Sequence, residues 1–183
     1  SKRSDVDFVV PQTRSIAASM ILYKKDASKP RTLVVSLIPT GDGDPLLLQY
    51  GRIPTEVRQV VLSDTAARKL NVKAGQDIIG KVGRSVAGAK EQVMVNLQIA
   101  DVLPHEAYVR EAAFVRLELL EATEDYRDGR GSKAFSWPGP VRPAGSRVYP
   151  SFRLYARSIY DVSELRNMLM DQGLEVYTKA EEI

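Results

Sequence analysis

Apolar and polar residues alternate along residues 91–102, which is the period of a β-strand that buries one face. Four further stretches are rich in β-branched or aliphatic residues and are bounded by polar or glycine-containing turns: 14–23, 31–38, 57–62 and 77–82. Only a short lysine-rich segment separates the first two of these stretches. The pattern therefore predicts a series of strands in the first half of the chain, beginning with a β-hairpin.

Two helices are predicted in the middle of the chain. Ser63 suits the N-cap of a short helix, because its hydroxyl can accept a hydrogen bond from a free backbone N–H of the first turn. Gly75 then turns the chain, since glycine adopts a positive φ without strain. Residues 118–128 read as an acidic helix that Gly129 ends. Residues 129–146 hold four glycines and three prolines, so we expect a long irregular loop there.

The last part of the chain predicts a strand–helix–strand unit. Apolar residues alternate within 151–157, as expected for a strand. Ser158 and Asp161 are both able to cap a following helix. The helix has one apolar stripe, formed by Val162, Leu165, Met168 and Leu169. Gly173 suits the position just beyond the helix, and residues 174–178 are predicted to form a returning strand.

Together these elements predict an α+β fold with two subdomains. Residues 1–50 and 105–183 would form a mixed α/β sheet subdomain that includes the C-terminal strand–helix–strand unit. Residues 51–104 would form a β-rich inserted subdomain. The total of 183 residues is compatible with one domain or two small ones.

Composition narrows the chemistry that the chain can perform. It contains no cysteine and a single histidine, His105. Disulfide scaffolds, thiolate metal sites, cysteine nucleophiles and metal sites built from several histidines are therefore excluded. His105 follows Pro104 in an expected loop with no identifiable nucleophile, so we interpret it as a surface residue.

The chain contains no stretch that could cross a bilayer as a helix. A spanning helix needs about 20 consecutive, mostly apolar residues. The longest uncharged stretch here is residues 32–41, which is ten residues long and includes Pro39. No apolar segment follows the basic start of the chain, as a signal peptide would require. The last residues contain no glycine or proline stop signal, and we expect the chain to be a piece of a longer protein.

Three motifs resemble catalytic or metal sites but depart from them at a decisive position. Residues 75–82 have P-loop spacing up to the lysine, but Val82 stands where a magnesium-binding hydroxyl is needed. Asp42 and Asp44 lack the further ligands of a calcium loop, so we favour a turn. For the carboxylates of 118–128 we favour an exposed acidic face over acid–base catalysis. We accordingly predict a non-enzymatic protein with no cofactor and no metal site.

The long loop carries the candidate partner contact. Tryptophan and arginine dominate the hot spots of protein interfaces, and Trp137 lies in this loop among Arg130, Arg142 and Arg147. The alternative is that Trp137 folds back to fill the core beneath the loop. The sequence leaves both interpretations open.

Several stretches carry a family resemblance through their order along the chain. Residues 51–54 (Gly-Arg-Ile-Pro) are followed by 60–63 (Val-Val-Leu-Ser) and by the positions Ala66, Leu70, Val72, Gly75 and Asp77. Residues 95–104 and 149–183 complete the set. Together they resemble the extracytoplasmic domain of MacB-like and LolC/LolE-like ABC transporter permeases, in the FtsX-like superfamily.

The resemblance implies an export-type ABC system in which a separate cytoplasmic subunit or domain, the cognate ATPase, hydrolyses ATP. The chain would be the water-soluble part of a membrane protein, on the periplasmic face of the bacterial inner membrane. It would be tethered by membrane helices and would belong to a dimeric transporter. Its role would be to couple helix movement to export or extraction of a lipophilic substrate or to a periplasmic protein, with no nucleic acid as partner.

Charge keeps a second class of function open. The net charge is +3, and residues 127–157 carry seven basic and one acidic side chain together with several aromatic residues. Basic residues interleaved with aromatic ones are typical of nucleic-acid interfaces. The alternative function is therefore a small basic nucleic-acid-binding module with a β-barrel-like core. An enzyme that uses carboxylates is a third possibility, and it would require a pocket with perturbed acids.

Overall fold

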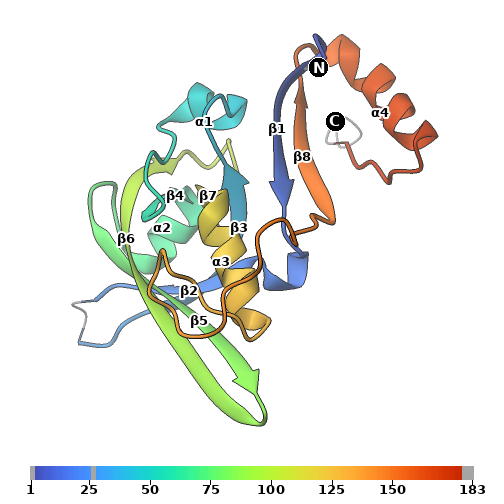
Figure 1. The fold of residues 1–183 in the computed structure, drawn as a ribbon. Coiled ribbons are helices and arrows are strands. Elements are labelled where there is room, and N and C mark those ends of the chain that lie inside the picture. Colours follow the sequence, from blue (N-terminus) through green and yellow to red (C-terminus); the bar gives the residue numbers. More distant parts are fainter. Residues whose placement is uncertain (1–2, 26–27, 179–183) are drawn as a thin grey trace.

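A computed structural model describes residues 3–25 and 28–178, which have the predicted α+β class (Figure 1). The strands are β1 (Val6–Gln12), β2 (Ser19–Tyr23), β3 (Thr32–Thr40), β4 (Gln59–Ser63), β5 (Asp77–Val86), β6 (Ala89–Leu103), β7 (Ala112–Arg116) and β8 (Ser151–Ala156). The α-helices are α1 (Pro45–Tyr50), α2 (Asp64–Leu70), α3 (Leu117–Arg127) and α4 (Val162–Asp171). Two short 3-10 helices are η1 (Ser15–Ala17) and η2 (Ile159–Asp161).

Six strands close into a barrel in the order β2-β3-β7-β4-β6-β5. β2 and β3 pair antiparallel, which confirms the predicted hairpin. β3 pairs in parallel with β7, and β4 pairs in parallel with β6, so strands distant in the sequence become neighbours. The alternation in β6 has the expected consequence, because every second side chain is buried in the core: Val93, Val95, Leu97 and Ile99.

The predicted subdomain boundaries near residues 50 and 104 run through this barrel. β2, β3 and β7 lie outside residues 51–104, yet they share one closed sheet with β4, β5 and β6. The β-rich part of the fold is therefore larger than the predicted insert. Hydrophobic periodicity identifies strands but not their partners, because the neighbours in a closed sheet leave no local signal in the sequence.

Helices α2 and α3 pack against the barrel. α2 begins as predicted, since the Ser63 hydroxyl accepts a hydrogen bond from the backbone N–H of Ala66 at 3.3 Å. α3 buries Leu119, Leu120 and Tyr126 in the same apolar cluster as the barrel interior. Among the described helices, none is long and apolar enough to span a membrane.

β1 and β8 form a separate two-stranded antiparallel sheet beside the barrel, and α4 follows β8 (Figure 1). We call β1, β8 and α4 the terminal arm. Gln12 pairs with Ser151 at the end joined to the barrel, and Val6 pairs with Ala156 at the far end. A two-stranded sheet is at best marginally stable alone, so the terminal arm depends on its contacts with the barrel.

The returning strand predicted for residues 174–178 is wrong. These residues adopt no strand conformation, and the side chains of Leu174 and Tyr177 are exposed. β8 pairs instead with β1, from the opposite end of the chain. Alternation of apolar and polar residues produces a strand only where a neighbouring strand supplies hydrogen bonds, and that requirement is not visible in a local pattern. The C-terminal unit is therefore a strand followed by a helix.

One turn and one helix also differ from the prediction. β5 and β6 extend into residues 83–90, which lie between the predicted strands 77–82 and 91–102, and the chain reverses at Ala87 and Gly88. Both residues have positive φ, 49° and 82°, as the tight two-residue turns of β-hairpins require. α1 has no counterpart among the predicted helices. The carboxylate of Asp44 caps it by accepting a hydrogen bond from the N–H of Leu46 at 3.1 Å.

Gly80 in β5 lies where the barrel interior has no room for a side chain. A Cβ atom there would lie 2.3 Å from Sδ of Met20 and 3.1 Å from Cγ1 of Val95. Gly80→Ala should therefore lower the free energy of unfolding by about 1–3 kcal/mol, the usual cost of overpacking. Gly83→Ala is the matched control on the same strand, because a Cβ there would meet only Glu91 O at 3.8 Å. Urea denaturation measures both, and equal effects would contradict the packing argument.

Candidate functional site

Four carboxylates lie on one face of α3 and just beyond its end. Glu121, Glu124, Asp125 and Asp128 follow the spacing i, i+3, i+4, i+7, which places side chains in one row along a helix. Tyr126 and the leucines of α3 occupy the face that packs into the barrel core. The helix therefore separates an apolar side from an acidic side.

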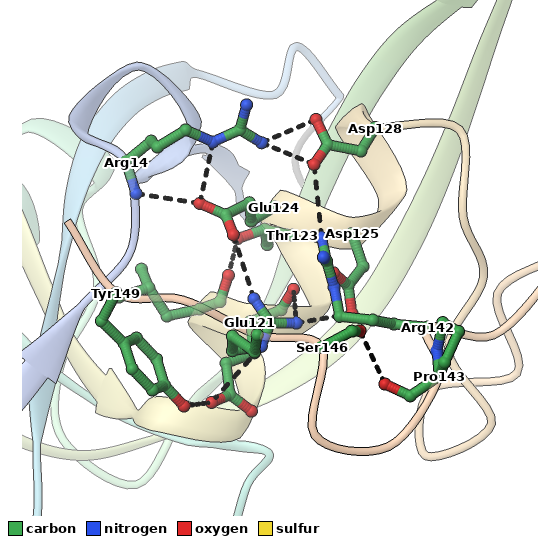
Figure 2. A network of polar contacts seen from close by, with 12 residues as sticks. Arg14, Glu121, Thr123, Glu124, Asp125, Asp128, Arg142, Pro143, Ser146 and Tyr149 are labelled. Carbon is green, nitrogen blue, oxygen red and sulfur yellow. Dashed lines mark hydrogen bonds and ion pairs between the residues drawn. The ribbon is translucent and has the colours of Figure 1, made fainter.

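The segment from β1 to β2 is the first connection between the terminal arm and the barrel. It is hydrogen-bonded to this row of four carboxylates, which we call the acidic row. Arg14 lies between β1 and η1, and its backbone N–H and Nε donate to Oε2 of Glu124 at 2.9 and 3.2 Å. Its Nη2 donates to both carboxylate oxygens of Asp128 at 2.6 Å. Figure 2 shows this side chain reaching across to α3. One arginine thus fixes the path of the chain as it leaves β1.

The segment from α3 to β8 is the second connection, and arginines in it donate hydrogen bonds to the same carboxylates. Arg147 donates from Nη1 to Glu124 at 3.0 Å and from Nη2 to Asp125 at 2.6 Å. Arg142 donates from Nε to the other oxygen of Asp125 at 2.6 Å and from Nη2 to Asp128 at 3.4 Å. Both arginine side chains are largely buried. Glu124 is therefore shared between the two connections, since it also accepts from Arg14.

Tyr149 extends the second connection to the N-terminal end of the acidic row. Its hydroxyl donates to Oε1 of Glu121, and Nε of Arg147 lies 3.7 Å from the same oxygen. Figure 2 shows the phenol ring beside the helix. We call these four carboxylates, the three arginines and Tyr149 the α3 clamp. Its ionic groups comprise four negative and three positive charges.

The environment of the α3 clamp shifts the pKa values of Tyr149, Arg142 and Arg14. Burial, together with the hydrogen bond to Glu121, raises the pKa of Tyr149 to about 12. The hydrogen bond to Asp125 raises the pKa of Arg142, and those to Asp128 and then Glu124 raise the pKa of Arg14. Arginines are already charged at ordinary pH, so the cations persist and the phenol remains a neutral donor.

A second ion pair joins the terminal arm to the barrel at a different point. Asp44 is fully buried at the end of β3, where the hydroxyl of Thr40 donates to it at 2.7 Å. Nη2 of Arg153, on β8, donates to the same carboxylate oxygen and also to the carbonyl of Pro39 at 2.8 Å. The guanidinium lies 5.7 Å from the ring centroid of Phe8 on β1. The Asp44–Arg153 pair thus connects both strands of the arm to β3.

The residues of the partner contact predicted from the sequence lie in different environments. Trp137 is 5% exposed and packs with Tyr126 and Phe135, and its Nε1 donates to the carbonyl of Met94 at 3.3 Å. Trp137 therefore belongs to the core, the second of the two interpretations open from the sequence. Arg142 and Arg147 lie in the α3 clamp. The carbonyl of Arg130 accepts a hydrogen bond from Nη1 of Arg84 at 2.8 Å.

The prediction of an exposed acidic face on residues 118–128 is wrong for the two carboxylates at its centre. The side chains of Glu124 and Asp125 are only 6% and 12% exposed, because arginines from two connections cover them. The sequence contains a signal for this arrangement, since an acidic block at 118–128 is followed by a basic block at 127–157. It does not identify the pairs, and it gives no reason to connect Arg14 with a helix more than a hundred residues away.

The remaining candidate residues lie in a strand, in a turn and around a surface hollow. Residues 77–82 of the P-loop-like motif are part of β5, so their N–H groups do not converge as a phosphate loop requires. His105 is exposed in a turn after β6. A hollow of about 690 Å³ is lined by Gln59, Gln98 and Asp101, among others, but the Asp101 carboxylate already accepts from the N–H of Arg52 at 2.9 Å. Within residues 3–25 and 28–178, no cluster of three or more histidine or carboxylate side chains could hold a metal ion.

No protein-family model matches this chain, and comparison with curated proteins gives no match either.

Trp137→Ala should lower the free energy of unfolding by about 3–5 kcal/mol, because it removes a large buried ring and leaves a cavity. Val148→Ala is the control from the same loop, since that side chain is almost fully exposed. Thermal and urea denaturation give both values. A Trp137→Ala variant as stable as Val148→Ala would show that the ring does not belong to the core.

Arg147→Ala should cost about 1.5–3 kcal/mol of unfolding free energy, because it removes one of the two arginines that donate to each of the largely buried carboxylates of Glu124 and Asp125. The control is Arg68→Ala, which removes an exposed pair with Asp64 on α2 and should cost at most about 0.5 kcal/mol. Arg147→Met retains much of the apolar stem and separates lost charge from lost packing. Equal stability of the Arg147 and Arg68 variants in urea denaturation would argue against the α3 clamp.

Proposed function

We propose that this chain is a non-catalytic, extracytoplasmic domain of an ABC transporter permease, which transmits movement of membrane helices to a substrate or partner outside the membrane. The observation that carries the proposal is the α3 clamp. It holds both connections between the terminal arm and the barrel on one helix, through Arg14 in the first connection and Arg147 in the second. Movement of the arm would therefore displace the barrel rather than bend the connections.

The pairing of β1 with β8 supports this role. The chain reaches the barrel along β1 and leaves it along β8, and the backbone N–H of Arg157 donates to the carbonyl of Asp5 at 2.9 Å. A domain inserted between two segments of a longer chain needs its incoming and outgoing strands close together. The terminal arm provides this geometry, and in the proposal it corresponds to the remainder of the α/β subdomain expected from the sequence.

The Asp44–Arg153 pair gives the arm a second fixed point. Buried ion pairs contribute little net stability, but breaking one is costly because a charge is left without a partner in a poorly solvated place. The pair lies at the end of β3, whereas the α3 clamp holds the connections at the base of the arm. Two separate attachments restrict rotation of the arm against the barrel, as a transmitting element requires.

The α3 clamp gives less support to the alternative function, a nucleic-acid-binding module. Binding to phosphates uses lysine and arginine side chains that release counterions when they contact the backbone. Arg142 and Arg147 are instead engaged by carboxylates of α3 and are largely buried. In the proposal, the partners are a cognate ATPase acting through membrane helices and a periplasmic protein or lipophilic substrate, within a dimeric transporter at the periplasmic face of the inner membrane.

The proposal requires an apolar segment of about 20 residues on each side of the chain in the complete protein. The complete permease, reconstituted with its ATPase in vesicles, should show a change in the distance between barrel and membrane during ATP hydrolysis. A fluorophore on Val34→Cys, an exposed position of β3, reports this distance through energy transfer to acceptor lipids. The chain has no cysteine of its own to compete for the label.

The Arg147→Ala substitution should reduce the ATP-dependent signal without stopping hydrolysis, whereas Arg68→Ala should leave both unchanged. Energy transfer that stays constant while the ATPase turns over would contradict the proposal. Hydrophilic flanking segments on both sides would contradict it as well.

A further inference from the structure

Two adjacent apolar side chains stand almost fully in solvent on the short turn between β8 and α4. Ile159 is 70% exposed and Tyr160 is 91% exposed. The turn itself is well defined, because the hydroxyl of Ser158 accepts a hydrogen bond from the N–H of Tyr160 at 3.2 Å. The N–H of Asp161 also donates to the carbonyl of Ser158 at 3.0 Å. The fold therefore holds these two side chains outward on an ordered backbone.

Their position in the fold is at the end of the terminal arm that is farthest from its connections to the barrel. Val6 pairs with Ala156 at this end, whereas Gln12 pairs with Ser151 where the arm joins the barrel. Figure 1 shows the β8–α4 connection beside the start of β1. The hydrogen bond from Arg157 to Asp5 places the turn next to the segment through which the chain reaches the arm.

Charges of both signs surround this turn, because Arg157 and Glu164 are both exposed. Arg3 donates to Asp5 at 2.8 Å, so that carboxylate is already paired. Arg157 is exposed two residues before Ile159, and Asp161 behind the pair is half-buried. Tyrosine with an aliphatic neighbour and a basic residue suits the boundary between lipid headgroups and acyl chains, where an amphipathic ring and a cation are both accommodated.

We propose that Ile159 and Tyr160 insert into the surface of a lipid bilayer and set the orientation of the terminal arm against it. The inference rests on the proposed function, because a membrane anchor that precedes β1 would bring this end of the arm to the bilayer. The turn then acts as a second point of membrane contact beside the anchor. The far end of the arm would then lie at the membrane surface. Movement of the anchor would be transmitted through the arm to the barrel.

The test uses the chain tethered to vesicles of phosphatidylcholine and phosphatidylglycerol through an N-terminal histidine tag and a nickel-chelating lipid. An environment-sensitive fluorophore is placed on Tyr160→Cys in one sample and on Ile16→Cys in the control. Ile16 is 86% exposed, but it lies in η1 at the barrel end of the arm. At position 160 we expect a blue shift on tethering and a loss of emission when acyl-chain nitroxide lipids are included, with neither change at position 16.

Adding Ile159→Ser should reduce both changes at position 160, and circular dichroism checks that the exposed substitutions leave the fold intact. Equal emission from the two positions on nitroxide vesicles would overturn the inference. A blue shift that grows with protein concentration without vesicles would also overturn it, since the turn would then bind a second copy of the chain. The tether supplies the anchor, so a negative result here leaves the proposed permease role to be judged by its own ATP-dependent distance measurement.

Discussion

The arrangement of the whole molecule depends on how charge is balanced along one face of α3. Glu124 and Asp125 are largely removed from water, and each is acceptable there because guanidinium groups donate to it directly. Those guanidinium groups come from both connections of the terminal arm. The requirement to neutralise two carboxylates therefore also fixes the path of the chain on either side of the barrel. The arm, too small to be stable alone, becomes part of the same body through this requirement.

The chemistry of the site follows from the same constraint. Carboxylates on a helix can serve acid–base catalysis when one is left free to exchange protons. Here the four carboxylates accept hydrogen bonds from arginines or from Tyr149. The arrangement favours holding over reacting, which is the basis of the mechanical role proposed for this domain. Trp137 adds to the holding, because its burial fixes the long loop that leads to Arg142 and Arg147.

Much of the local structure could be predicted from the sequence, because it is determined by neighbours in the chain. The Ser63 cap, the alternation in β6 and the hairpin of β2 and β3 depend on residues a few positions apart. The closed barrel and the β1–β8 sheet depend on pairings across long separations, which leave no periodic signal. The α3 clamp could be predicted from the sequence only in part. Its acidic row is visible as helical spacing, whereas the matching cations are visible only as a charge excess and, for Arg14, not at all.

The pairing of β1 with β8 has a consequence for how the chain folds. Residues of the first strand meet partners about 145 positions later, so among the described strands this is the pairing of longest range. Closing a flexible loop of that length costs conformational entropy, and the cost falls once the intervening residues are compact. The barrel must therefore assemble early and act as the scaffold that brings the two strands together. During synthesis, β1 would leave the ribosome before the other described strands and yet be among the last of them to find its place.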